Sequence, residues 1–383
     1  MPNTSHVPII VIAPDSFKGS LSAEQAANAI ATGIRRARAD AVIRICPMAD
    51  GGEGTLDALL AQGGERQNLS VRGAAGSTRD AAAGLLASGH GVIETAEIVG
   101  ITDPIGMSVP VEVRSTTGMG DAIRTMLDAG VRQFFIALGG SSTNDGGAGL
   151  LAGLGVRFLD ENGKALEPTP QQLAQLARVD ISQLDPRLAE ASFVAMSDVD
   201  NPLTGEHGAT LVFGAQKGVR PEQASALDTT LARYAGLLET ALNRSARNLP
   251  GAGAAGGLGF ALHLLGAQFE SGAEVVARQT GLDAALDGAS WLITGEGRSD
   301  RQTLHGKAPF VASQHARAAG VPTTLLSGAV DAAALPYLAP YFMGCFSPAP
   351  GPLSLDTALR EAGALLANEA EQLTRLKYGD KPV

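Results

Sequence analysis

The stretch from Val7 to Cys46, VPIIVIAPDSFKGSLSAEQAANAIATGIRRARADAVIRIC, predicts the fold class. It begins with an apolar, strand-like run over 7–13 and continues with helical periodicity over 22–38. A second apolar run over 41–46 ends it. A strand, a helix and a further strand in this order are typical of α/β proteins with a mainly parallel sheet. Ser22 is the predicted cap of the helix.

The other end of the chain repeats this alternation. Apolar runs predict strands at 290–294, 322–326 and 342–346, and helices are expected at about 306–319 and 353–373. The middle differs. Two strand-like runs at 81–87 and 91–97 follow each other without a helix, which indicates antiparallel or mixed pairing. A longer helix is expected over 221–243, and 160–186 is expected to be a polar connection.

We therefore expect two domains, since 383 residues exceed the usual size of a single core. Residues 1–80 and 285–383 are predicted to form one doubly wound α/β domain from both chain ends. Residues 81–284 are predicted to form an inserted mixed α/β domain.

The charge balance restricts the class of partner. The formal net charge is 29 − 39 = −10, with no basic cluster, which argues against nucleic acid. The first residues lack a cationic region, and the apolar run over 7–13 is too short for a signal peptide or a membrane span. We expect a cytoplasmic protein that binds neither membrane nor nucleic acid, with its oligomeric state left open.

The most informative polar loop is GGSSTNDGGAG, residues 139–149. It follows the apolar run 134–138 and leads into a helix-like segment at 148–152. Glycines allow close approach of a ligand, and the unpaired N–H groups at a helix N-terminus attract anions. The loop suits a phosphate with its metal, or a polyhydroxy acid. A polar turn with a helix cap is the alternative.

Five other polar loops follow strand-like or apolar segments, and ligands of open α/β sheets bind beyond the carboxyl ends of strands. Their ranges are 13–20, 49–55, 197–203, 250–259 and 294–307. Their structural alternatives are a surface turn for the first, helix capping for the second and an Asx turn for the third. The loop 250–259 contains GxGxxG but follows a polar segment rather than a strand, so we expect close helix packing or a substrate-facing turn there instead of a dinucleotide site. The densest set of acid, base and hydroxyl groups lies in 294–307.

Six motifs together resemble the bacterial type-1 glycerate kinases, and they cover the chain from residue 9 to past 310. They are APDSFKGSLSA (13–23), PMADGGEGT (47–55), GGSSTNDGGAG (139–149), SDVDNPLTG (197–205), GAGAAGGLGF (251–260) and TGEGRSDRQTLHGK (294–307). The resemblance implies ATP-dependent phosphorylation of (R)-glycerate to 2-phosphoglycerate and ADP, with Mg²⁺. It also implies a flavodoxin- or Rossmann-like domain formed from both ends, an inserted domain, and an active site in the cleft between them.

If the chain catalyses phosphoryl transfer, as the resemblance implies, it needs a base, cations, metal ligands and groups that bind the substrate and the nucleotide. The predicted catalytic residues are Asp198 as the base and Lys18 with Arg298 as the cations. Asp200, Glu296 and Asp300 are the predicted metal ligands. The residues predicted to bind substrate or nucleotide are Asp15, Ser16, Asp50, Glu53, Gly139, Gly140, Ser141, Ser142, Thr143, Asn144, Asp145, Asn201, Gly256, Gly257, His305 and Lys307.

Two other functions remain open at this stage. The same architecture could phosphorylate another small hydroxy acid, or the 3-hydroxyl of glycerate. A non-catalytic regulator that binds a nucleotide or a sugar acid is the second alternative, but no DNA-binding or effector-reading module is visible in the sequence.

Overall fold

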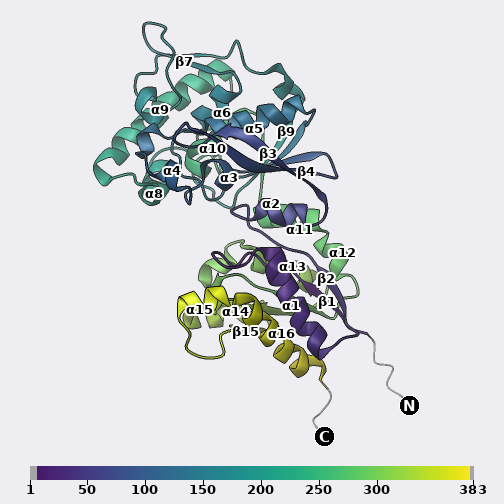
Figure 1. The fold of residues 1–383 in the computed structure, drawn as a ribbon. Helices are drawn as coiled ribbons and strands as arrows, with labels where there is room; N and C mark the ends of the chain where they lie inside the picture. The colour runs from purple at the N-terminus through teal and green to yellow at the C-terminus, as the bar shows by residue number, and fades with distance from the viewer. Residues whose placement is uncertain (1–6, 380–383) are drawn as a thin grey trace. The chain divides into compact units, whose positions relative to one another are not determined.

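The computed structural model describes residues 7–379, which form two compact units with separate sheets (Figure 1). Unit 1 runs to Asp50, includes Asp57–Gln62 and resumes at Gly272. Unit 2 comprises Gly51–Leu56 and Gly63–Ser271.

The sheet of unit 1 is parallel throughout and uses both ends of the chain. Its order is β15 (Gly344–Phe346), β13 (Thr323–Leu326), β11 (Trp291–Thr294), β1 (Ile9–Ile12) and β2 (Val42–Ile45). Each neighbouring pair is parallel, with Ile10 opposite Trp291 in the central pair. The predicted parallel sheet built from both chain ends is confirmed.

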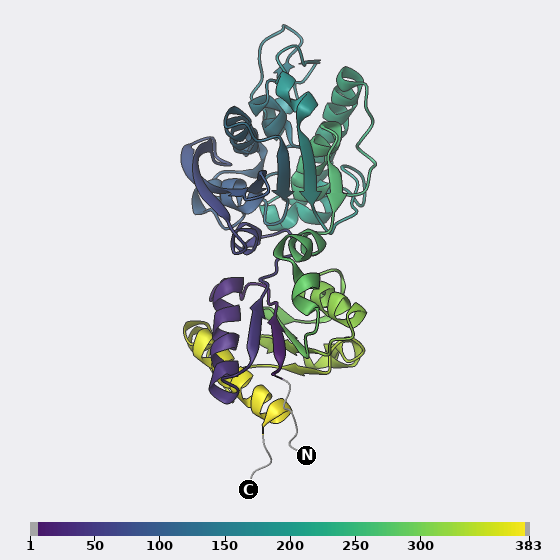
Figure 2. The same cartoon turned by 90° about the vertical axis from the view of Figure 1, so that its right-hand side faces the viewer.

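Helices cover both faces of this sheet. The first and last helices, α1 (Ala23–Ala37) and α16 (Ala362–Tyr378), lie side by side, purple and yellow in Figure 1. Ile30 and Leu366 from these helices share a buried cluster with Ile10 of the sheet. The green helices α11 (Gly272–Thr280), α12 (Leu282–Leu286) and α13 (Ala308–Ala318) lie across the sheet from them (Figure 2).

The predicted cap of α1 is confirmed. The Ser22 hydroxyl accepts a hydrogen bond from the Gln25 amide at 3.2 Å, and the Gln25 side chain accepts one from the Ser22 amide at 3.0 Å. This reciprocal pair satisfies two amides that the helix itself leaves unpaired.

The sheet of unit 2 is mixed. Its order is β10 (Gln268–Glu270), β9 (Ser192–Met196), β6 (Gln133–Ala137), β5 (His90–Glu94), β4 (Thr78–Leu86) and β3 (Gly64–Arg72). The first four strands are parallel to one another, and β4 is antiparallel to both its neighbours. The predicted mixed pairing in an inserted segment is therefore confirmed.

One large core fills unit 2. It includes Phe134 of β6, Phe158 and residues of the four main helices, α5 (Thr117–Asp128), α6 (Ala148–Gly153), α9 (Pro221–Leu242) and α10 (Ala254–Leu264). Tyr234 of α9 lies 5.9 Å from Phe260 of α10 between ring centres and donates its hydroxyl proton to the Gly146 carbonyl at 3.2 Å. The core thus extends up to the glycine-rich loop 139–149.

Short elements complete the described chain. They are α2 (Thr55–Leu60), α3 (Thr95–Val99), α4 (Pro104–Met107), α7 (Pro170–Leu173), α8 (Ala209–Phe213), α14 (Leu335–Leu338), α15 (Leu355–Arg360), β7 (Arg157–Leu159), β8 (Arg178–Asp180), β12 (Arg298–Ser299), β14 (Ala329–Val330) and the 3₁₀ helices Val111–Val113, Pro186–Glu190, Ala215–Lys217, Arg301–Leu304 and Ala332–Ala334.

Several boundaries differ from those expected. The main segment of unit 2 begins at Gly63 rather than 81, because β3 pairs with β4 along its whole length, and the short segment Gly51–Leu56 also belongs to unit 2. The main segment ends at Ser271 rather than 284, because α11 and α12 pack on α13 of unit 1. The single helix expected over 353–373 is two helices, α15 and α16, which meet at Glu361. The expected connection 160–186 contains α7 and β8.

Candidate functional site

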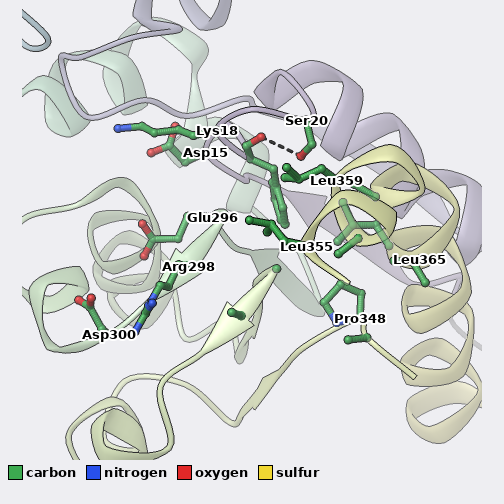
Figure 3. A pocket seen from close by; sticks show the side chains of 18 of the residues that line it. Asp15, Lys18, Ser20, Glu296, Arg298, Asp300, Pro348, Leu355, Leu359 and Leu365 are labelled. Atoms are coloured by element: carbon green, nitrogen blue, oxygen red, sulfur yellow. Dashed lines mark hydrogen bonds between the residues drawn. The ribbon is translucent and has the colours of Figure 1, made fainter. Parts of the chain in front are cut away.

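The carboxyl ends of β1 and β11 bring the first candidate site together in unit 1. The two strands are neighbours, so the loops after them leave the sheet at the same edge. Asp15 and Lys18 follow β1, whereas Glu296, Arg298 and Asp300 follow β11, and all five line one cavity of about 500 Å³ (Figure 3). Asp50, after β2, and Lys307 also line it.

Glycines allow the loops at this edge to pack backbone against backbone. A Cβ atom on Gly295 would lie 1.7 Å from the Leu326 carbonyl oxygen, and one on Gly328 would lie 2.5 Å from the Gly297 carbonyl oxygen. The Asp15 amide donates to the Gly295 carbonyl at 2.8 Å. Gly295 and Gly328 are therefore required for close packing, and the Gly295 carbonyl holds the backbone of Asp15 in place.

Asp15 carries the strongest electrostatic perturbation of this edge. Its side chain is buried, and the Ser16 amide donates to its Oδ1 atom at 2.6 Å. Burial, followed by the negative charges of Asp50 and Glu296, raises the pKa of Asp15 well above its ordinary value, although Ser16 and Lys18 oppose the rise. The Ser16 hydroxyl oxygen is buried without a hydrogen-bond partner. Excess negative charge beside an unpaired hydroxyl is an environment that a cation would relieve.

Glu296 is held by three neighbours. Its Oε1 atom accepts hydrogen bonds from Ser299 at 3.0 Å and Thr303 at 2.7 Å, and its Oε2 atom lies 3.4 Å from the Lys307 ammonium. Asp300 accepts a bond from the Gln302 amide at 2.7 Å and so caps a 3₁₀ turn. Both predicted metal ligands thus line the cavity while serving the loop itself.

The cations of this edge are more accessible. Lys18 and Arg298 are exposed, and the Lys307 side chain is 31% exposed. His305 is also exposed but does not line the cavity. Lys18, Arg298 and Lys307 therefore bring three positive charges to the same cavity, where they can bind a polyanion.

A second candidate site lies in unit 2, at the carboxyl ends of the parallel strands β6 and β9. Since β6 and β9 are parallel neighbours, with Ala137 opposite Met196, the loop 139–145 and the segment 197–201 leave the sheet together. Asp198 and Asp200 are exposed. The Asn201 side chain donates to the His207 carbonyl at 2.8 Å.

Asp145 is directed into the protein. Its carboxylate accepts hydrogen bonds from the Thr116 amide and hydroxyl at 2.7 and 2.8 Å and from the Gly147 and Gly149 amides at 3.1 Å each. Burial raises its pKa in spite of these bonds. The Ser142 hydroxyl likewise donates inward, to the Val99 carbonyl at 2.8 Å. Both side chains hold the shape of the loop.

Two buried cations that the sequence analysis did not single out support the same loop. The Lys217 ammonium donates to the Ser141 hydroxyl and to the Thr143 carbonyl, both at 2.9 Å. Arg114 donates to the Ser142 carbonyl at 3.0 Å and to the Lys217 carbonyl at 2.9 Å. Neither residue belongs to a recognisable motif, so no local signal marks them.

Two polar atoms of the loop are unsatisfied. The Thr143 hydroxyl oxygen and the Asn144 side-chain oxygen are buried and have no hydrogen-bond partner, although the Asn144 amide donates to Thr210 at 2.9 Å. Buried polar atoms are nearly always paired, and exceptions concentrate where a ligand or an ordered water binds.

Glu94 is a third buried charged residue that the sequence analysis did not single out. It ends β5 and accepts hydrogen bonds from the Gly54 and Leu56 amides at 3.2 and 3.0 Å, at the N-terminus of α2. Burial raises its pKa to about 7. The predicted residue Glu53 is exposed. The carboxylate that stabilises this helix start is therefore Glu94.

The glycine pair Gly256–Gly257 packs directly on the loop. Gly256 accepts a hydrogen bond from the Gly146 amide at 2.9 Å, and a Cβ atom on it would lie 2.0 Å from the Thr143 carbonyl oxygen. Gly140 and Gly256 both have positive φ, at 74° and 68°. Gly139 is equally crowded, because a Cβ atom there would lie 2.5 Å from the Gly52 Cα atom. Close packing, one of the two roles expected for 250–259, is what these contacts provide.

Gly256→Ala is expected to destabilise the protein strongly. Gly163 is the matched control, since its φ is +79° and nothing lies within 4 Å of an added Cβ atom. Gly163→Ala should cost only the left-handed backbone penalty, about 1–2 kcal/mol. Gly256→Ala should cost about 1–3 kcal/mol more, because the Thr143 carbonyl must move. Urea unfolding measures both, and equal midpoints for the two variants would contradict the packing role.

Lys217 should make stability depend on pH. Burial is the largest cause that lowers its pKa, from 10.5 to about 7, with Arg114 adding to the decrease and Asp145 opposing it. The unfolded chain then binds one proton more than the folded chain between these values. The free energy of unfolding therefore gains a contribution that is complete above pH 10.5 and is lost as the pH falls to about 7.

The comparison of wild type with Lys217→Met isolates this contribution. Wild type should gain stability relative to the variant from pH 7 to 9.5, by at most about 1.4 kcal/mol per pH unit. Urea unfolding at a series of pH values measures it. Parallel stability curves would show that the buried ammonium keeps its ordinary pKa.

No helix of the described chain is long and apolar enough to cross a membrane. Within residues 7–379, no group of three or more His, Cys, Asp and Glu side chains forms a metal cage.

The parallel sheet of unit 1, the mixed sheet of unit 2 and the polar loops at their carboxyl edges define an α/β protein of the class whose ligands bind beyond the carboxyl ends of the strands. Comparison with known proteins gives the family. The sequence profile described as "Glycerate kinase family" matches residues 10–377, so the chain belongs to the glycerate kinase family.

Proteins named as glycerate kinases are similar in sequence to this chain over most of its length. A protein of Halalkalibacterium halodurans named "Glycerate kinase" is 41% identical over 97% of this chain and 99% of its own length. The Escherichia coli K12 protein named "Glycerate 2-kinase" is 40% identical over 84% of this chain and 85% of its own. A crystal structure from Salmonella typhimurium LT2, described provisionally as glycerate kinase 2, has 39% identity and a TM-score of 0.86, and the match covers 98% of this chain and 99% of that one.

Proposed function

We propose that this protein transfers the γ-phosphoryl group of ATP to the 2-hydroxyl of (R)-glycerate, giving 2-phosphoglycerate and ADP. Membership of the glycerate kinase family supports the reaction class, and the name of the Escherichia coli relative supports the 2-hydroxyl. The observation that carries the proposal is the joint presence of three cations and four carboxylates in one cavity at the edge of a parallel sheet: Lys18, Arg298, Lys307, Asp15, Asp50, Glu296 and Asp300.

The strand order supports a ligand at this edge. If the five strands of unit 1 are numbered 1 to 5 along the chain (β1, β2, β11, β13, β15), their order across the sheet is 2-1-3-4-5. This is the strand order of flavodoxin-like folds. The order reverses between β1 and β11, and ligands of such sheets bind at the carboxyl ends of the strands on either side of this point. Asp15 and Glu296 follow these two strands.

Phosphoryl transfer mainly requires positioning and neutralisation of charge, because the transferred group passes through a loose transition state. Lys18 and Arg298 are our candidates for the cations that meet the transferred group and its neighbouring phosphates. Lys307, paired with Glu296, would contribute a third positive charge at the same end.

The residues of this edge also fit Mg²⁺. This ion usually binds to one or two carboxylates and completes its coordination with waters and phosphate oxygens, so it needs no cage of protein ligands. Asp15, with Asp50 close enough to raise its pKa, and the unpaired Ser16 hydroxyl make the better-suited group, since Glu296 and Asp300 already bind their own loop. A bound Mg²⁺ ion would neutralise charge on the phosphates.

The edge of unit 2 supplies groups suited to a small hydroxy acid. We assign the base to Asp198, with Asp200 and Asn201 orienting it, and the binding of glycerate oxygens to Ser141, Thr143 and Asn144. The hydroxyl proton passes to the Asp198 carboxylate while the hydroxyl oxygen bonds to the γ-phosphorus. The bond from this phosphorus to the bridging oxygen breaks and releases ADP. A cleft shared by the two units stays a prediction.

Coupling to enolase tests the proposal. With ATP, Mg²⁺ and (R)-glycerate, added enolase should form phosphoenolpyruvate without phosphoglycerate mutase. A requirement for mutase would move the reaction to the 3-hydroxyl. Release of ADP with another hydroxy acid but not with glycerate would refute the substrate, and no release of ADP with any acceptor would refute the kinase.

A further inference from the structure

The cavity of unit 1 has two chemically different halves. Charged side chains lie on one side, and aliphatic side chains from α15, α16 and the segment after β15 lie on the other (Figure 3). The aliphatic wall consists of Pro348, Ala349, Leu355, Ala358, Leu359, Ala362, Leu365 and Leu366. The charged half accounts for phosphate binding, whereas the wall has no role in the mechanism above.

We propose that the aliphatic wall binds the base of the nucleoside triphosphate, so that this cavity is the nucleotide site. The assignment rests on the proposed kinase function for the identity of the ligand as a triphosphate. A nucleoside triphosphate has a planar, largely apolar body at one end and a polyanion at the other. A cavity of about 500 Å³ with matching halves lies within the usual range for sites of such size.

Glycerate does not fit this wall. It has three carbons, each bearing oxygen, and would leave the leucines without an apolar partner while losing hydrogen bonds to water. A nucleotide base instead buries apolar surface on both sides. The small acid is therefore assigned to the polar loop 139–145 rather than to this cavity.

The exposure of Leu355 supports a bound partner. This leucine lines the cavity and is 74% exposed, at the start of α15. A bound base would cover it.

The wall offers no side chain that could distinguish one base from another. Among the described residues that line the cavity, Ser20 is the one with an uncharged polar side chain, and its hydroxyl already donates to the Phe17 carbonyl at 2.9 Å. Selection between bases reaches about 10⁴-fold when a site is built to hydrogen-bond a group, whereas apolar pockets discriminate weakly. The protein should therefore use ATP and GTP with kcat/KM values within about tenfold of each other.

Wall variants test the site directly. Leu355→Ser and Leu359→Ser should each weaken ADP binding about five- to tenfold in isothermal titration without glycerate, since each loses apolar contact with the base. In the same variants the KM for ATP should rise, and the KM for glycerate should stay unchanged. Leu355 is exposed, so its variant keeps the fold even if Leu359→Ser does not.

Leu376→Ser is the matched control. Leu376 is 81% exposed on α16 and does not line the cavity, so this variant should bind ADP like wild type. Unchanged ADP affinity in Leu355→Ser and Leu359→Ser, or a preference for ATP over GTP above about 10³-fold, would overturn the assignment. Wall-dependent ADP binding in a protein that fails to phosphorylate glycerate would refute the proposed function and leave the nucleotide site standing.

Discussion

Asp198→Asn is expected to lower kcat by roughly 10²–10⁴-fold, because a positioned general base contributes about this much. The residue follows β9, beside the loop that follows β6, and its side chain is exposed to solvent rather than held in the core. An amide of the same size cannot accept the proton of the attacking hydroxyl. Steady-state assays with saturating ATP and glycerate measure kcat, and KM for ATP should change little.

Asp80→Asn is the control for this variant. Asp80 is an exposed carboxylate on β4 of the same unit, and it lines no candidate site. Its replacement should leave kcat unchanged. A folded Asp198→Asn protein with kcat within threefold of wild type would remove Asp198 from the role of base.

Lys217→Met should lower kcat by about 10²-fold, because misplacement of a binding group by about 1 Å can cost this much. Lys217 acts through the loop: it holds the Ser141 hydroxyl and the Thr143 carbonyl beside Asn144. Methionine has similar length and no donor, so the loop loses both bonds while the space stays filled.

The readout must separate positioning from simple loss of folded protein. We expect KM for glycerate to rise together with the fall in kcat, ADP affinity to stay at the wild-type value, and circular dichroism to stay native. Lys164→Met, at an exposed lysine of the same unit, is the control and should behave like wild type. Wild-type kcat and KM in folded Lys217→Met would show that the loop keeps its shape without the ammonium.

The local patterns of the sequence were sufficient for the architecture. The apolar runs at 7–13 and 290–294 predicted strands, and these became β1 and β11 at the centre of one sheet. The periodicity over 221–243 predicted a helix, which is α9. Domain boundaries were less predictable. The nine-residue pairing of β3 with β4 places β3 in unit 2, and the local sequence of neither strand specifies its partner.

The site was predictable only where its residues share a motif. Asp15 with Lys18, and Glu296 with Arg298, lie in loops whose composition marked them, and the structure brings them to one cavity. Lys217 was missed because it reaches Ser141 from 76 residues away, without any local signal.

The direction of a side chain is also hidden in the sequence. Asp145 lies in the most glycine-rich polar loop, yet its carboxylate faces four donors inside the protein. A carboxylate that holds a loop and one that faces a ligand have the same sequence context, and only the three-dimensional partners distinguish them.

The central pairing of β1 with β11 imposes an order on biosynthesis. The Thr294 hydroxyl bonds to the Ala13 carbonyl 281 residues away, so at about 5–20 residues per second the first strand waits roughly 15–60 s on the ribosome for its inner neighbour. During that time its hydrogen-bonding edge is open to wrong partners. Ile9 and Tyr378 both bond to Ser290, so the two ends of the described chain lie close together. A circular permutant that joins the termini and starts at Gly272 would bring the two large segments of unit 1 together in the chain and shorten the delay.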